Sequence, residues 1–375
     1  TAADQPMISY NKNLVMLFNG EIYNYIELAK EYNISSKDGD SRVAIELFSK
    51  FGVNILKKFN GMFSIVLYNK LKKNISLIRD RLGTKPLYYS KKGNCYYFAS
   101  EIKALPIKKN IDQKIIDEYL TFGKYPVIKS FFKQISNVPP SSIIQISKGK
   151  FNVEKYFDIK NNVLRKSNEK FDENKFEELL KKAISIRQRA DRKINFHLSG
   201  GIDSTSLLIF TKDNWSSKYK ISSSSFSYYG YKDDEYRYID KISKRLKIKN
   251  NKVTLFPEEV PELAEKLQYF QDEPFGGLAS VAEYKLNLEE TKKGETVSFE
   301  GMGGDEILGG YNSHFLLALN ESLKKDKLNK NISEMKSYLG LSTTEVIKKS
   351  KKLVESGFNV STDLSDLKPL AKINN

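Results

Sequence analysis

Short apolar runs separated by turn residues mark the first 150 positions of the chain. The run at 13–18 is strand-like and meets the turn dipeptide Asn19-Gly20, which we expect to end the strand. Further strands are predicted at 62–68, 75–79, 86–90, 95–100 and 142–147, and helices at 22–31, 41–50 and 111–122. Strands that follow one another without long intervening helices pair antiparallel. The pattern therefore predicts a layered α+β domain over residues 1–155.

The pattern changes after a polar stretch at 160–174, which we interpret as a linker. Beyond it, predicted strands alternate with predicted helices. The strands are at 193–198, 220–229, 252–255 and 296–299, and the helices at 176–187, 205–212, 233–246, 257–270 and 281–292. Such alternation builds a mostly parallel, doubly wound sheet. We therefore expect an α/β domain over 172–375, in a chain of 375 residues that is long enough for two cores.

A glycine-rich loop follows the first strand of the second domain, with the sequence Ser199-Gly200-Gly201-Ile202-Asp203-Ser204. Ligands of open parallel sheets bind at the carboxyl ends of the strands. Two glycines let the backbone approach a polyanion, and N–H groups at the start of the next helix face it. Asp203 adds a carboxylate suited to Mg²⁺. The loop lacks the lysine of a Walker A motif, and an ordinary turn with a helix cap is the alternative.

A second glycine-rich loop follows the predicted strand at 296–299. Its sequence is Glu300-Gly301-Met302-Gly303-Gly304-Asp305-Glu306, and Gly309-Gly310-Tyr311 comes shortly after. Two such loops at neighbouring strand ends can grip one triphosphate. Asp203 and Asp305 would then form a metal pair that neutralises charge as pyrophosphate leaves.

The formal charge of +16 raises the question of nucleic acid binding. Of the 62 basic residues only 9 are Arg, although bidentate contacts to guanine and phosphate favour Arg. The lysines are spread along the chain, and no basic block is interleaved with aromatic residues. We interpret them as a solvated surface, with some attraction of anionic substrates as the alternative. No apolar run approaches a membrane span, and a single cysteine fits a reducing cytoplasm.

Several motifs in order resemble the glutamine-hydrolysing asparagine synthetase family. The 199–204 loop, Asp272-Glu273-Pro274 and the 301–311 stretch are similar to its ATP-pyrophosphatase domain. The first domain resembles the class II glutamine amidotransferase domain of that family. Its matching segments are Phe18-Asn19-Gly20-Glu21-Ile22-Tyr23-Asn24, Phe59-Asn60-Gly61-Met62-Phe63, 79–88 and 99–105. The resemblance covers residues 3 to 315.

This resemblance implies an N-terminal-nucleophile-type layered sandwich that frees ammonia from glutamine. It implies that an α/β domain of the adenine nucleotide alpha hydrolase type follows. Asn19 and Gly20 match the family's oxyanion hole, whose donors stabilise a tetrahedral intermediate. Glu21 and Asp40 match the carboxylates that hold the amino group of glutamine.

The resemblance further implies ATP with Mg²⁺. The matching ATP-binding positions are Leu198, Ser199, Gly200, Gly201, Asp203, Ser204, Tyr228, Glu300 and Gly301. Tyr228 replaces a small aliphatic residue, so it either stacks on adenine or packs in the core.

The sequence departs from the family at two chemically important positions. No residue matches the nucleophile, a cysteine that starts the mature family proteins, and we interpret Cys95 as an ordinary strand thiol. Met302 stands where the family usually has a Glu that serves the adenylate step, and a thioether accepts no proton. We therefore assign no catalytic residue. We expect the first domain to be N-terminally incomplete and the second C-terminally incomplete, as in a fragment or a shortened product.

The two histidines do not repair these departures. We interpret His197 as a hydrogen-bonded core residue on the strand before the first loop. His314 lies in a helix-like region without a partner at catalytic spacing.

We interpret the chain as a ligase that forms an amide on a carboxylate, using glutamine, ATP and an acyl-adenylate, with aspartate as the expected acceptor. Met302 leaves open another carboxylate, such as a sugar uronate of a surface polysaccharide. The missing nucleophile leaves open an inactive ATP-binding remnant, and a nucleic-acid modifier using the same loop is a weaker alternative. We expect small-molecule partners, no nucleic acid and no membrane, and we leave a homodimer open.

Overall fold

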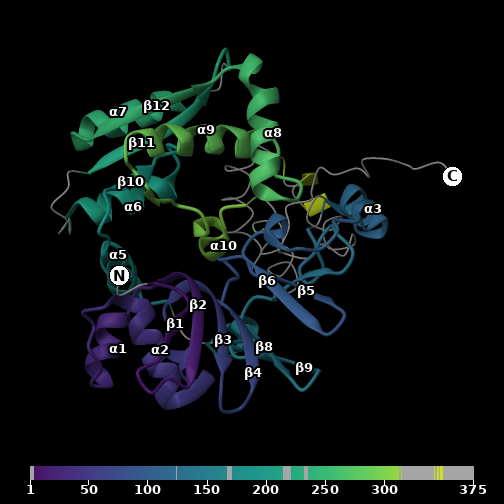
Figure 1. Ribbon diagram of the computed structural model, residues 1–375. Coiled ribbons are helices and arrows are strands. Elements are labelled where there is room, and N and C mark those ends of the chain that lie inside the picture. Colours follow the sequence, from purple (N-terminus) through teal and green to yellow (C-terminus); the bar gives the residue numbers. More distant parts are fainter. Residues whose placement is uncertain are drawn as a thin grey trace.

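The computed structural model describes most of the chain as two domains, drawn one above the other in Figure 1. The described residues are 4–123, 125–166, 171–213, 221–231, 235–311, 314, 342, 344–345 and 347–348. Among these residues, no helix has both the length and the apolar character needed to cross a bilayer.

An antiparallel sheet forms the centre of the first domain, as predicted. Its strand order is β1-β2-β3-β4-β8-β9. The strands are β1 (Met7–Ile8), β2 (Leu14–Ile22), β3 (Gly61–Asn69), β4 (Asn74–Arg79), β8 (Ser142–Ser147) and β9 (Lys150–Lys155). Side chains alternate between the two faces of each strand, and β3 is buried on both faces. The sheet is therefore an inner layer with a covering on each side.

Helices cover one face of this sheet and a smaller sheet covers the other. α1 (Tyr25–Glu31), α2 (Gly39–Phe51) and the 3₁₀-helix η1 (Gly52–Lys58) pack on β2 and β3. On the opposite face, a three-stranded sheet of order β6-β5-β7 packs over β4 and β8. Its strands are β5 (Tyr88–Lys92), β6 (Cys95–Ala99) and β7 (Ile135–Asn137). Between β6 and β7 the chain forms the 3₁₀-helix η2 (Ile102–Ala104) and the helix α3 (Gln113–Phe122).

The predicted turn at Asn19-Gly20 is wrong, because β2 continues through both residues to Ile22. Asn19 and Gly20 lie opposite Ser64 and Phe63 of β3. Gly20 has φ 151°, and a Cβ there would lie 2.1 Å from the carbonyl oxygen of Met62. The glycine is needed for close approach of the strands and not for a turn. The helix predicted from position 22 accordingly begins only at Tyr25.

The second domain is built on a fully parallel sheet, as predicted, with strand order β12-β11-β10-β13. The strands are β10 (Ile194–His197), β11 (Ser222–Tyr228), β12 (Lys249–Leu255) and β13 (Val297–Phe299). α5 (Glu173–Arg187), α6 (Ile202–Asp213) and α7 (Tyr236–Leu246) cover one face. α8 (Val260–Gln271) and α9 (Leu278–Lys292) cover the other, after the short η3 (Pro257–Glu259).

The strand order reverses at β10, whose neighbours are β11 on one side and β13 on the other. The connections leaving β10 and β13 therefore emerge side by side at one edge of the sheet. In doubly wound folds this switch point is where ligands bind. The connection after β13 leads into the short helix α10 (Gly304–Leu308).

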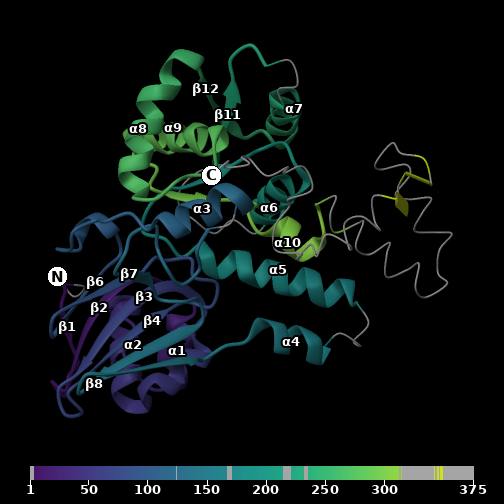
Figure 2. The ribbon, with the colours of Figure 1, turned by 90° about the vertical axis from the view of Figure 1, so that its right-hand side faces the viewer.

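The segment predicted as a linker is partly helical. α4 (Ile159–Lys166) lies within it, and Asp172 caps α5 by accepting a hydrogen bond of 3.0 Å from the Lys175 N–H. Figures 1 and 2 both place α5 between the two domains. Beyond the end of α5, Arg189 donates to the Tyr23 carbonyl at 3.0 Å and forms an ion pair with Glu27 of α1. The connection between the domains is thus a structured contact.

We expect the Gly20→Ala variant to lower the free energy of unfolding by about 3 kcal/mol, since its methyl would overlap the backbone of β3. Gly149→Ala is the matched control, because Gly149 also has a positive φ, 75°, but open space around its Cβ position. That control should lose only about 1 kcal/mol. Urea unfolding checks both, and equal losses would contradict a steric role for Gly20.

Candidate active sites in the two domains

The loop after β10 is held by its own serines. Ser204 Oγ lies 3.0 Å from Ser199 Oγ and accepts a hydrogen bond from the Ser199 N–H at 3.2 Å. Gly200 adopts φ 84°, a conformation that favours glycine. Leu198 is buried at the end of the strand, whereas Ser199 and Gly201 are exposed. The loop therefore presents backbone N–H groups and the N-terminus of α6 to solvent, an arrangement suited to an anion.

The second loop packs directly against the first. A Cβ at Gly301 would lie 2.8 Å from the Ser204 nitrogen, and a Cβ at Gly304 would lie 2.3 Å from Asp203 Oδ2. Only glycine leaves room for this approach. The structure therefore brings together the two loops that the sequence placed at neighbouring strand ends.

Acidic side chains from both loops gather at this contact. Burial, together with the charges of Asp305 and Glu306, raises the pKa of Asp203 above its usual value. Carboxylates this close disfavour each other unless a cation lies between them. Carboxylate oxygens are also the ligands that Mg²⁺ prefers. Asp203 and Asp305 therefore fit a divalent cation by the chemistry of their oxygen atoms and by their mutual charge effect.

His197 ends β10, the strand that leads into the first loop, and it contacts Glu300 at the start of the second loop. The sequence did not reveal this contact. The Nε2 of His197 lies 3.0 Å from Glu290 of α9, and its Nδ1 lies 3.0 Å from Glu300. Burial disfavours the charged imidazolium, yet the bonds to these two carboxylates outweigh it and raise the pKa of His197 to about 9. The expectation of a hydrogen-bonded histidine is confirmed, and its partner Glu300 is one of the predicted ATP-binding residues.

A buried polar layer supports this histidine. Asn195, which is fully buried, donates to Ser224 of β11 at 2.7 Å and also to Glu290. Glu290 accepts a further bond of 3.0 Å from Ser298 on β13. Glu290 therefore ties three parallel strands to α9. Neither the alternation of Ile194 and Phe196 nor the serines of β11 marked this layer in the sequence.

Three ligand-type side chains meet beside this layer, namely His197, Glu283 and Glu300, whose nearest ligand atoms lie within 4.8 Å of one another. Both ring nitrogens of His197 already contact carboxylates. An imidazolium held between acids accounts for this arrangement without a metal.

Tyr228 ends β11 beside a pocket of about 660 Å³. The pocket is lined by Tyr228, Tyr229, Gly230, Tyr231, Leu255, Phe256, Pro257, Val260 and Leu278. The ring of Tyr228 packs edge-on against Phe226 and Tyr231, at centroid distances of 5.8 and 6.2 Å. Tyr228 is thus partly a core residue and partly a wall that can face a planar ligand.

The predicted glutamine-site residues of the first domain also converge. Asn19 Nδ2 donates to Ser100 Oγ at 3.2 Å, and the Asp40 carboxylate accepts the Ile22 N–H at 2.9 Å. Burial and the nearby charges of Asp40 and Asp191 raise the pKa of Glu21 to about 7, although Lys85 opposes the shift. Two carboxylates in one half-buried place favour a cationic group such as an ammonium.

The 79–88 motif has a structural role that its sequence did not disclose. Asp80 is buried and accepts backbone N–H groups of Phe63, Leu82, Thr84 and Lys85, at 2.9 to 3.2 Å. Arg79 donates to three carbonyl oxygens, of Gly83, Lys85 and Val138. These bonds fix the loop that brings Lys85 toward Glu21.

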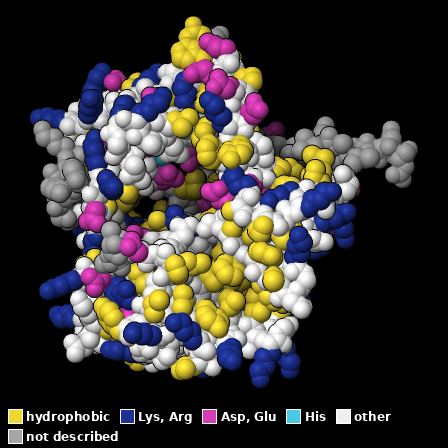
Figure 3. Space-filling model, viewed as in Figure 1, with side chains coloured by type: hydrophobic (Ala, Val, Ile, Leu, Met, Phe, Trp, Pro, Cys, Tyr) yellow, Lys and Arg dark blue, Asp and Glu magenta, His cyan; other side chains and the backbone are white. Residues whose placement is uncertain are grey.

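Three further side chains that the sequence analysis discussed are Cys95, Met302 and His314. Cys95 is exposed and starts β6, at the opposite end from Ser100, so it is a strand thiol as interpreted. Met302 is 79% exposed at the second loop. His314 packs against the Tyr311 ring at 5.1 Å, and only isolated residues are described beyond it. In the space-filling view, basic side chains are scattered over the visible face, and acidic ones lie both around the hollow between the domains and at the top of the second domain (Figure 3).

Comparisons with known proteins agree with both domains. The family model described as glutamine amidotransferase domain matches residues 1–157, and the model described as asparagine synthase matches residues 175–366. These matches define a two-domain α/β protein with an amidotransferase part and a synthase part. The chain belongs to the asparagine synthase family.

Curated relatives carry the corresponding names. A putative glutamine-hydrolysing asparagine synthetase 2 of Methanocaldococcus jannaschii is 32% identical over 80% of this chain and 60% of its own length. Asparagine synthetase 1 of Bacillus subtilis is 30% identical over 82% of this chain and 49% of its own length. The chain thus spans about half to three fifths of these relatives. A solved allosteric regulatory enzyme of purine biosynthesis overlaps 67% of this chain and 62% of its own, at 13% identity and a TM-score of 0.32, too low for an argument.

Because of its two ion pairs, we expect His197 to keep its proton to a higher pH in the folded protein than in the unfolded chain. In the unfolded chain the imidazole loses its proton near pH 6.5, whereas the folded protein holds it to about pH 9. The stabilisation is therefore complete below pH 6.5, and it falls by up to about 1.4 kcal/mol per pH unit until about pH 9. The chain has 2 histidines, so an NMR titration of their ring protons, assigned with His197→Gln, measures this pKa directly. A midpoint below 7 would contradict the ion-pair account.

Proposed function

We propose that the protein is a glutamine-dependent, ATP-driven ligase that converts aspartate to asparagine through an aspartyl-adenylate. The proposal assigns residues 1–155 to glutamine hydrolysis and residues 172–375 to adenylation and amide formation. It is supported by the family membership and by the names of the curated relatives.

The observation that carries the proposal is the contact of the two glycine-rich loops at the switch point. Gly301 lies against the backbone at Ser204, and Gly304 lies against the carboxylate of Asp203. One polyphosphate bound at the first loop would therefore also face the acids of the second. Such a grip on a triphosphate suits a reaction that expels pyrophosphate.

We assign the ATP contacts to the residues around that loop contact. The phosphates would lie on the N–H group of Gly200 and the N-terminus of α6, next to Gly201 and the hydroxyl groups of Ser199 and Ser204. Adenine and ribose would lie near Leu198, Tyr228, Glu300 and Gly301. His197 holds the Glu300 side chain in place through a bond of 3.0 Å.

Asp203 and Asp305 would hold Mg²⁺, which neutralises the phosphate charge as pyrophosphate departs. The aspartate carboxylate then attacks the α-phosphorus, and ammonia displaces AMP from the acyl-adenylate. Met302 accepts no proton, so deprotonation of the attacking ammonium must occur elsewhere or before it arrives.

In the first domain we assign Asn19 and Gly20 to the oxyanion hole and Glu21 and Asp40 to the ammonium of glutamine. The helix, sheet and sheet layers agree with a sandwich of the N-terminal-nucleophile type. Asn19, Gly20 and Glu21 lie on β2, which pairs with β3 along all three residues. The bonds of Arg189 to Tyr23 and Glu27 hold the two domains together, which passage of ammonia from one domain to the other would require.

Replacing either acid of the loop pair should stop adenylation. We expect Asp203→Asn and Asp305→Asn to lower aspartate-dependent ATP–pyrophosphate exchange by about 100-fold or more, because the phosphate charge would lose its counter-ion. Asp213→Asn, at the exposed end of the same helix α6, is the control and should keep the wild-type rate. Unchanged exchange in both loop variants would refute the assignment of this site. A panel of other carboxylates, including uronates, tests the choice of aspartate.

Glutamine binding should depend on pH through Glu21. The ligand's ammonium needs the ionised carboxylate, whose pKa is about 7 in the free protein. Affinity should therefore rise about tenfold per pH unit below pH 7 and level off above it. Calorimetric titrations with glutamine, made at values from about pH 5.5 to about pH 8.5 so that they bracket this pKa, measure the affinity directly.

The matched variants separate this effect from general charge. Glu21→Gln should bind glutamine weakly at every pH, whereas Glu31→Gln, on the exposed side of α1, should keep the wild-type profile. A pH-independent affinity of the wild-type protein would contradict the role of Glu21.

A further inference from the structure

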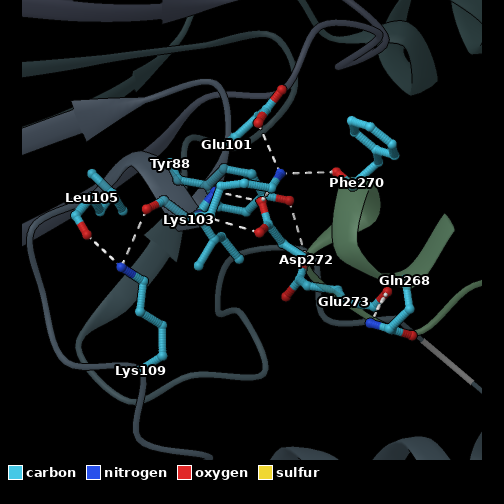
Figure 4. Close-up of polar contacts among 10 residues, drawn as sticks. Tyr88, Glu101, Lys103, Leu105, Lys109, Gln268, Phe270, Asp272 and Glu273 are labelled. Carbon is cyan, nitrogen blue, oxygen red and sulfur yellow. Dashed lines mark hydrogen bonds and ion pairs between the residues drawn. The ribbon is translucent and has the colours of Figure 1, made fainter. Parts of the chain in front are cut away.

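The tripeptide Asp272-Glu273-Pro274 follows α8 in the second domain, yet its two acidic side chains bind the first domain (Figure 4). Asp272 Oδ2 accepts the Ile102 N–H at 2.8 Å, and Oδ1 accepts the Lys103 N–H at 3.2 Å. Lys103 Nζ adds a bond of 3.2 Å to the same carboxylate. The Asp272 side chain is only 10% exposed, so this charge is paired in a largely dry contact.

Glu273 makes a second set of bonds beside the first. Its Oε1 accepts the Phe131 N–H at 2.9 Å, and its Oε2 accepts the Tyr88 hydroxyl at 3.0 Å. Tyr88 belongs to β5, the central strand of the three-stranded sheet. We call Asp272 and Glu273 together the acidic latch. It holds the start of η2, strand β5 through Tyr88, and the segment at Phe131.

The backbone at the latch is itself specialised. Asp272 ends α8 with φ 64°, a left-handed conformation that Asp tolerates better than most residues. Its N–H donates to the Gln268 carbonyl at 3.1 Å, and the Glu273 carbonyl accepts a bond of 3.0 Å from the Gln268 side chain. The helix end thus aims both carboxylates at the first domain. Nothing in this geometry serves the nucleotide loops directly.

Ile102, which bonds to Asp272 of the acidic latch, lies two residues after Ser100 in the chain. Ser100 immediately precedes Glu101-Ile102-Lys103, and its Oγ accepts the bond of 3.2 Å from Asn19 Nδ2. Bonds to the N–H groups of Ile102 and Lys103 therefore restrict the backbone next to Ser100, which carries this hydroxyl. That hydroxyl orients the Asn19 amide, which the proposed function assigns to the oxyanion hole.

We infer that Asp272 and Glu273 are positioning residues for glutamine hydrolysis: the synthetase domain uses them to hold Ser100, and through it Asn19, in the hydrolytic geometry. The inference rests on the proposed function for the role of Asn19. The structural link itself runs through Ser100 and depends on no activity. The glutamine-binding acids Glu21 and Asp40 lie outside this link, because Asp40 bonds to Ile22 and Ser41 instead.

The structural link is tested by NMR of the Asn19 side-chain amide, assigned with Asn19→Asp. In Asp272→Asn/Glu273→Gln this signal should shift or broaden, while the amide of Asn24, which donates to the Lys58 carbonyl, should stay in place. Asp272→Asn alone keeps the left-handed backbone and serves if the double variant does not fold. Glu27→Gln is the matched control, because it weakens a different ion pair between the domains, with Arg189, without touching Ser100. An unmoved Asn19 signal, with shifted amides of Ile102 and Lys103, would overturn the inference.

The kinetic consequence separates positioning from simple docking. In a protein that also carries the family's nucleophilic cysteine, which this sequence does not contain, a misaligned oxyanion donor should lower kcat for glutamine hydrolysis about tenfold, with KM for glutamine changed less than about twofold. Amide formation from added ammonia should stay at the wild-type rate. A rise in KM with unchanged kcat would contradict the inference. Absence of hydrolysis in that cysteine-containing protein, with Asp272 and Glu273 unchanged, would count against the proposed function instead, and the amide signal would still decide the structural link.

Discussion

The close approach of two glycine-rich loops at one edge of the parallel sheet is the constraint on which the second domain depends. A side chain at Gly301 would collide with the start of α6, and one at Gly304 would collide with Asp203. Because these positions are glycine, the acids of both loops meet where α6 presents its N-terminus. The rest of the domain maintains this geometry. Glu290 of α9 bonds to Asn195 and His197 of β10 and to Ser298 of β13, and Asn195 bonds in turn to Ser224 of β11. His197 also bonds to Glu300 of the second loop.

Much of this arrangement could be predicted from the sequence, since it follows from local patterns. Alternating strands and helices gave the parallel sheet, and the position of 199–204 after a strand gave the site. The failures have a common cause. Asn19-Gly20 has the composition of a turn, but the neighbouring strand β3 needs glycine at position 20 for its own approach. A dipeptide cannot reveal a partner that lies more than forty residues away in the chain.

The polar interior was hidden for the same reason. Asn195, Ser224 and Glu290 are ordinary surface residues in composition, and only the packing of α9 over the sheet makes them a buried layer. Asp272 and Glu273 were associated with the nucleotide domain by their place in the chain, whereas their bonds lie with Ile102, Lys103, Tyr88 and Phe131 of the other domain. Long-range hydrogen bonds of this kind leave no periodic signal.

In the proposed reaction, a carboxylate of the acceptor attacks ATP at the α-phosphorus. Aspartate labelled with ¹⁸O in its side-chain carboxylate tests this most directly, with ATP, Mg²⁺ and ammonia present and the products analysed by mass spectrometry. Attack through the acyl-adenylate transfers one labelled oxygen to AMP, leaves the other in the side-chain amide of asparagine, and releases unlabelled pyrophosphate. Formation of ADP and labelled phosphate, or of AMP without the label, would contradict the account.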